Sequence, residues 1–116
     1  MLKIFLILII IDLIYLKIYG YPLYSKLVKN ITNEDIKFNY LGIVAYILIS
    51  YGLYYFIIKE NKNYKDAFLL GLIIYGTFDF TNIAIFSKYD VKIAILDTIY
   101  GGILLALTTY IYKLIN

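Results

Sequence analysis

Four long stretches of mostly apolar residues make up most of this 116-residue chain. Crossing the hydrocarbon core of a bilayer, roughly 30 Å thick, takes about 20 such residues as an α-helix. Lipid offers no partners to backbone N–H and C=O groups, so a stretch of this kind must bond within itself as a helix. We therefore predict an all-α polytopic membrane protein, a single domain over residues 1–116, with transmembrane helices at residues 2–19, 40–58, 67–86 and 93–115.

The connections between these helices are short, and they constrain how the helices are arranged. Short links make sequential helices antiparallel neighbours, so the predicted architecture is an up-down-up-down four-helix bundle. Pro22 stands near the predicted end of the first helix, where its missing N–H costs least. Thr32 followed by Asp35 fits a variant of the capping box, which predicts a short interfacial helix leading into the second span.

Three aspartates interrupt the apolar stretches: Asp12 in the first, Asp79 in the third and Asp97 in the fourth. A charged side chain near the bilayer centre costs about 2.5–3.5 kcal/mol on insertion scales, so such residues face a bundle interior and mark functional sites. At a rise of about 1.5 Å per residue, all three fall between the midplane and the membrane face that carries the first and third connections. We expect them to point inward and to lie in one polar layer.

Helical spacing places further polar side chains beside the aspartates. Tyr75, Asp79 and Asn82 share one face of the third predicted helix, at positions i, i+4 and i+7. The first and fourth helices each carry a tyrosine three residues after their aspartate, again on the same face. We expect Asn82 and at least one tyrosine to lie within hydrogen-bonding reach of the aspartates. The residues predicted to bind a ligand are Asp12, Tyr15, Tyr46, Tyr75, Asp79, Thr81, Asn82, Asp97 and Tyr100.

Three segments of the chain resemble a known family of small bacterial integral membrane proteins, domain-of-unknown-function family 2177. The segments are IDLIYLKIYG at residues 11–20, YGTFDFTNIAIF at residues 75–86 and LDTIYGGILLAL at residues 96–107. The family typically has an Asp with an aromatic residue and Leu in the first helix, a YDxTN-like motif in the third, and an Asp with an aromatic residue and Gly in the fourth. The matching positions here are Asp12, Tyr15, Leu16, Asp79, Thr81, Asn82, Asp97, Tyr100 and Gly101.

The chain departs from the family pattern at three aromatic positions. Tyr15 and Tyr100 stand where the family often has tryptophan, and Phe78 replaces a usual tyrosine. Each departure keeps an aromatic ring and leaves the aspartates intact. The resemblance covers nearly the whole chain and implies a four-helix membrane architecture with its site at the aspartates. The family has no established biochemical function, so the resemblance implies no particular reaction.

Several classes of chemistry are excluded by composition. Cysteine and histidine are both absent, which removes disulfides, thiolate nucleophiles, haem and iron–sulfur ligation and the ordinary zinc sites. The formal net charge is only +3 and the lysines are scattered, unlike the clustered basic residues of a nucleic-acid-binding surface. We therefore expect no cofactor, no resident metal and no nucleic-acid partner. The expected partner is the lipid bilayer, with a second copy of the chain or another membrane protein as further partners.

Three functions fit these observations. The first is binding of a small polar ligand, a proton or a hard cation in the carboxylate layer, where oxygen ligands suit Na⁺, Mg²⁺ or Ca²⁺. The second is a lipid-modifying membrane enzyme, or an accessory subunit of one, with paired aspartates as acid and base. The third is a structural or accessory subunit whose aspartates pair with the helices of a partner. A binding or catalytic site is favoured because the three aspartates and Asn82 are expected to share one layer. Four short helices leave little room for a substrate cavity, which weighs against an enzyme that acts alone.

Orientation in the membrane is weakly specified by lysine. The side that carries both termini has five lysines and the opposite side has six, so the positive-inside rule gives no decision. Three lysines gather within residues 59–65, in the connection between the second and third helices. This cluster favours an integral membrane protein with both termini in the cytoplasm.

Overall fold

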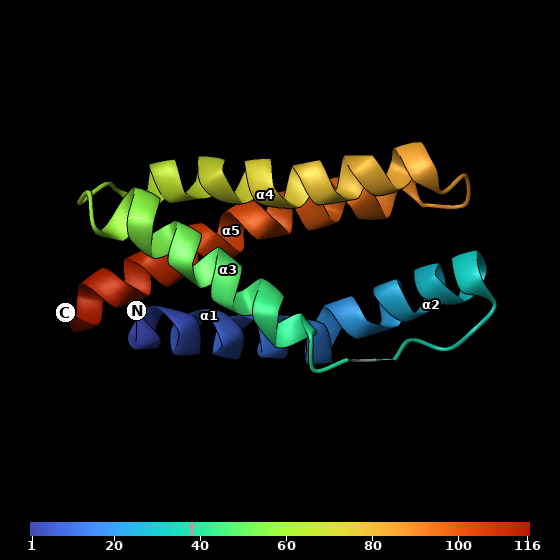
Figure 1. The fold of residues 1–116 in the computed structure, drawn as a ribbon, viewed down its shortest axis with the longest axis horizontal. Helices are drawn as coiled ribbons and strands as arrows, with labels where there is room; N and C mark the ends of the chain where they lie inside the picture. Colours follow the sequence, from blue (N-terminus) through green and yellow to red (C-terminus); the bar gives the residue numbers. More distant parts are fainter. Residues whose placement is uncertain (38) are drawn as a thin grey trace.

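The computed structural model describes residues 1–37 and 39–116, in which every regular element is helical. The helices form four rods (Figure 1): α1, η1 and α2 join in the first, α3 and η2 in the second, and α4 and α5 are one rod each. In chain order the elements are α1 (Leu2–Tyr15), η1 (Leu16–Gly20), α2 (Tyr21–Thr32), α3 (Gly42–Leu53), η2 (Tyr54–Ile58), α4 (Tyr64–Ile85) and α5 (Val91–Ile115). The predicted all-α fold with four helical rods is confirmed.

The outer surface of the bundle is strongly apolar. Large side chains such as Ile10, Ile14, Ile47 and Leu69 are exposed on the outside of their helices. Among the described residues, α4 and α5, with 22 and 25 residues, are long and apolar enough to cross a membrane, whereas the rod Gly42–Ile58 is apolar but shorter. An apolar exterior of this kind suits lipid. Passage of all four rods through the bilayer stays a prediction.

The first rod continues well beyond the predicted span, because α1, η1 and α2 join end to end. In the π-helical turn η1 each hydrogen bond spans five residues instead of the four of an α-helix, which alters the backbone pairing locally. Pro22, which has no N–H to donate, follows this turn in the first turn of α2. The proline therefore lies inside the rod, at a site of altered pairing, instead of ending it.

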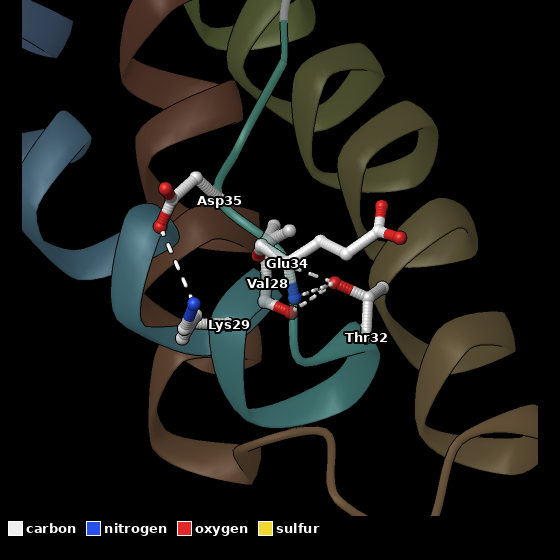
Figure 2. A network of polar contacts seen from close by, with 5 residues as sticks. All are labelled: Val28, Lys29, Thr32, Glu34 and Asp35. Carbon is white, nitrogen blue, oxygen red and sulfur yellow. Dashed lines mark hydrogen bonds and ion pairs between the residues drawn. The ribbon is translucent and has the colours of Figure 1, made fainter.

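Thr32 is the last residue of α2, so the short helix predicted to begin there is wrong. Its hydroxyl donates to the carbonyl of Val28 at 2.9 Å and accepts the N–H of Glu34 at 3.1 Å (Figure 2). Nearby, the ammonium of Lys29 and the carboxylate of Asp35 form an exposed ion pair at 3.6 Å. The side chain that resembled the start of a capping box thus closes the preceding helix.

Helices α4 and α5 form an antiparallel pair around which the other rods are placed (Figure 1). Their axes approach closely because small residues face each other: Gly71 on α4, and Gly101 and Gly102 on α5, are all buried. A Cβ atom added at Gly71 would collide with the backbone carbonyl of Gly101. Small residues allow such close contact between membrane helices.

The apolar core lies towards the end of the bundle that holds both chain termini. Helix α1 packs against α5, and α3 packs against α1. The fully buried large aliphatic residues are Ile4, Leu8, Leu53, Leu104 and Leu105. Helix α2 lies beyond this core, at the end where α4 connects to α5 (Figure 1). The predicted site adjoins this core, because Tyr100 belongs to the same buried cluster and Tyr15, Tyr46 and Tyr75 pack against it.

We expect Gly71→Ala to lower the free energy of unfolding by about 1–3 kcal/mol, because the new methyl group overpacks the α4–α5 contact. The matched control is Gly52→Ala, since a Cβ at Gly52 has nothing within 4 Å. Alanine favours a helix interior over glycine by about 0.8–1.0 kcal/mol, so the control should be neutral or more stable than wild type. SDS titration in mixed micelles measures both changes, and equal stability of the two variants would contradict the close contact.

Candidate functional site

All three aspartates of the apolar stretches are buried, as the predicted cost of a carboxyl group in lipid requires. Asp79 has no exposed surface, and Asp12 and Asp97 keep at most 9%. They come from three different helices, α1, α4 and α5. Burial of a carboxyl group is tolerated only where hydrogen-bond donors surround it. The donors supplied to each aspartate therefore define the site.

Asp12 receives two tyrosine hydroxyls from two neighbouring helices. Tyr100 of α5 donates to Oδ1 at 2.7 Å, and Tyr46 of α3 donates to Oδ2. Each carboxylate oxygen thus has its own phenolic donor. This group of three side chains, which we call the Asp12 cluster, ties α1, α3 and α5 together.

Asp79 and Asp97 form a second group, in which the two carboxyl groups are close neighbours. Tyr24 of α2 donates to Oδ1 of Asp97 at 2.6 Å, and Tyr89 donates to Oδ1 of Asp79 at 3.0 Å. The hydroxyl of Thr98 lies 3.4 Å from Oδ2 of Asp79. We call Asp79 and Asp97 the carboxyl pair.

Tyr89 lies in the connection between α4 and α5, beside the carboxyl pair and Asn82. Its hydroxyl donates to Asp79, and the side chain of Asn82 is a close neighbour. Burial raises the pKa of Tyr89 to about 12, and the nearby Asp79 carboxyl adds to this effect. The phenol is therefore a neutral hydrogen-bond donor throughout the physiological pH range.

Aromatic contacts join the Asp12 cluster to the carboxyl pair. The ring of Tyr15 stacks on that of Tyr100, with centroids 3.6 Å apart. The hydroxyl of Tyr15 also lies 3.3 Å from that of Tyr24, which bonds Asp97. Tyr75 packs edge-on against Tyr100, with centroids 6.4 Å apart. Tyrosines on α1, α2, α4 and α5 thus connect the two groups into one polar layer.

A cavity of about 420 Å³ opens beside the carboxyl pair, between α2 and the α4–α5 hairpin. Its polar lining residues are Tyr24, Thr32, Tyr75, Asn82, Tyr89 and Asp97. Its remaining walls are apolar and come from α2, α4 and the residue after α4. Asp12 does not line this cavity, and Tyr46 of the Asp12 cluster lines a separate cavity of about 600 Å³. The carboxyl pair therefore has a space in front of Asp97.

Most of the nine predicted site residues come together in this layer, and one does not. Thr81 is exposed, and its hydroxyl donates to the carbonyl of Thr77 on its own helix at 2.6 Å. It lies two residues from Asp79, roughly 200° around the helix, so it faces away from the bundle. Thr81 therefore points away from the other predicted site residues, although it belongs to the YDxTN-like motif of the third predicted helix.

The sequence reasoning missed three residues that bond the carboxyl pair: Tyr24, Tyr89 and Thr98. Tyr24 and Tyr89 looked like interfacial tyrosines because they lie outside the predicted spans. Thr98 directly follows Asp97, but its hydroxyl reaches Asp79 of the opposite helix. Helical spacing can identify residues on one face of one helix, whereas these contacts depend on how helices pair.

The described residues contain no group of three or more His, Cys, Asp or Glu side chains that could hold a metal ion. The three aspartates do not converge on one point, because Asp12 has its own tyrosine donors and lies apart from the carboxyl pair.

The all-helical fold, apolar exterior and buried carboxyl groups define a small helical membrane protein. Residues 1–113 match a family model described as "Predicted membrane protein (DUF2177)". The chain belongs to this family, which confirms the resemblance drawn from its motifs, and as a membrane protein it resides in the lipid bilayer. No curated protein and no solved structure matched the chain.

We expect Tyr100→Phe to lower the free energy of unfolding by about 0.5–2 kcal/mol, because it removes one of the two donors to buried Asp12. Tyr110→Phe is the matched control on the same helix: its exposed ring packs against Tyr64, and the substitution keeps that ring. SDS titration in mixed micelles gives both values. A loss of the same size in both variants would show that the hydroxyl of Tyr100 does not support Asp12.

Proposed function

We propose that this protein binds, within the membrane, an amphiphile whose polar end hydrogen-bonds to the carboxyl pair. The observation that carries this proposal is the cavity beside Asp97, which joins a buried carboxyl group to an otherwise apolar space. Ligand sites in proteins are mostly apolar hollows of roughly 300–1,000 Å³ with a few convergent polar groups. The cavity, at about 420 Å³, falls within this range.

The apolar walls of the cavity favour a ligand that enters from the lipid. Leu27 and Ile31 of α2 face Phe78 of α4 and Phe86 across it. Phe78 and Phe86 also keep 60% and 43% of their surface exposed, so they lie at the border between the cavity and the outside of the bundle. A ligand with an alkyl chain can therefore pass between bilayer and cavity along apolar side chains.

The polar end of the cavity favours a ligand that donates hydrogen bonds. Asp97 presents a carboxyl group, and Asn82 presents an amide that can donate or accept. A hydroxyl or amine at the end of an alkyl chain would match these acceptors. A carboxylate would meet the carboxyl pair with like charge, which disfavours it. The proposed ligand class is thus long-chain alcohols and amines, including lipids that carry such groups.

The arrangement of the whole chain in the bilayer is part of the same proposal. All four rods cross the membrane up, down, up and down, with both termini in the cytoplasm. In support, consecutive rods reverse direction, and the connection between η2 and α4 lies at the end that holds both termini (Figure 1). That connection carries the lysine cluster of residues 59–65.

Asp97→Asn should weaken binding of dodecylamine and 1-dodecanol to the purified full-length protein at least about tenfold, since a carboxyl acceptor at the cavity is lost. Native mass spectrometry from detergent micelles measures both probes, with dodecanoate as the comparison that should bind worst. Asp66→Asn is the control because Asp66 is exposed at the start of α4. Unchanged binding by Asp97→Asn, or preferred binding of dodecanoate, would refute the proposal.

Single cysteines can test the proposed orientation, because the chain has none of its own. We expect a membrane-impermeant maleimide added to intact cells to label Ser87→Cys, in the exposed connection before α5, and to leave Asn61→Cys unlabelled. After the cells are lysed, both variants should react. Labelling of Asn61→Cys in intact cells would reverse the orientation, and labelling of both would contradict the alternating topology.

A further inference from the structure

A second cavity, of about 540 Å³, lies on another side of α2, between that helix and the start of α5. Three lysines border it: Lys26 of α2, Lys88 of the connection after α4, and Lys92 in the first turn of α5. They come from three separate segments of the chain. Only the fold brings them together, at the end of the bundle where α4 connects to α5 (Figure 1).

The charge of these three lysines is largely uncompensated. The ion pair found among the described residues joins Lys29 to Asp35 and involves none of the three. Asp90 also lines the cavity, but its carboxylate accepts the backbone N–H groups of Lys92 and Ile93 and so caps α5. The cavity therefore has three ammonium groups against one carboxylate that is already bonded. This charge favours an anion.

The floor of the same cavity is apolar. Leu23 and Leu27 line it from α2, and Ile93 and Leu96 line it from α5. On both helices the aliphatic residue lies closer to the bundle centre than the lysine. On α2, Leu23 precedes Lys26, and on α5, Leu96 follows Lys92. The space thus has a basic rim and an aliphatic interior. A free inorganic anion would use only the rim.

We propose that this basic cavity binds the phosphate headgroup of an anionic phospholipid, with the start of an acyl chain against Leu23, Leu27 and Leu96. Basic pockets between membrane helices hold lipid headgroups, and each lysine near an anionic surface contributes attraction. The aliphatic floor favours a lipid-borne phosphate over free phosphate. This site is independent of the carboxyl pair, although Leu27 lines both cavities and makes them neighbours.

The experiment reconstitutes the full-length protein in nanodiscs with equal amounts of palmitoyl-oleoyl phosphatidylglycerol and phosphatidylcholine. After extraction into detergent, mass spectrometry measures the ratio of the two lipids retained on the protein. We expect wild type to retain the phosphatidylglycerol in excess. The triple variant Lys26→Gln/Lys88→Gln/Lys92→Gln should retain both lipids equally. Each single Lys→Gln variant should lower the ratio of retained phosphatidylglycerol to phosphatidylcholine about fivefold.

The control removes the same charge from the opposite end of the bundle, as Lys59→Gln/Lys62→Gln/Lys65→Gln, and should keep the wild-type preference. The single variant Lys26→Arg keeps the charge and should behave as wild type, and circular dichroism verifies that each variant is folded. Equal retention of the two lipids by wild type, or an equal loss in both triple variants, would overturn the proposal. Displacement of the lipid by millimolar inorganic phosphate would assign the cavity to free phosphate instead, which also overturns it.

Discussion

A carboxyl group enclosed by apolar side chains must be given hydrogen-bond donors, and the rest of this structure depends on how the chain supplies them. Histidine is absent, and the lysines lie outside the centres of the predicted spans. Tyrosine supplies the donors instead: the hydroxyls of Tyr46, Tyr100 and Tyr24 all bond an aspartate on another helix. A phenol suits this position because its ring packs in the core while its hydroxyl donates.

The two groups of aspartates have different surroundings, and this separates a structural role from a binding role. Asp12 has a donor for each oxygen, so it resembles a bond between helices. Asp97 has one tyrosine donor, a carboxyl neighbour and an adjacent cavity. The structural interpretation therefore fits Asp12, whereas the proposed ligand binding concerns Asp97. The proposed function needs only the second.

The sequence was sufficient to predict the fold class and the burial of the three aspartates, because the cost of charge in lipid leaves few alternatives. Helical spacing also selected Asn82 and Tyr100. Spacing failed for Tyr24, whose position depends on a rod that continues through a π-helical turn and past Pro22. Periodicity describes one helix at a time. It therefore could not predict that α2 contacts α5, or that the α4–α5 connection contacts Asp79.

The central claim is that a tyrosine hydroxyl on one helix stabilises a buried aspartate on another. A double-mutant cycle between Asp12→Leu and Tyr100→Phe measures this interaction directly, with the free energy of unfolding of all four proteins obtained by SDS titration in the same mixed micelles. The account predicts a coupling energy of about 0.5–2 kcal/mol, the range for hydrogen bonds between membrane helices and for residues in contact. If the effects of the two single substitutions add up to the effect of the double substitution within about 0.3 kcal/mol, the two side chains do not interact. That result would contradict the account.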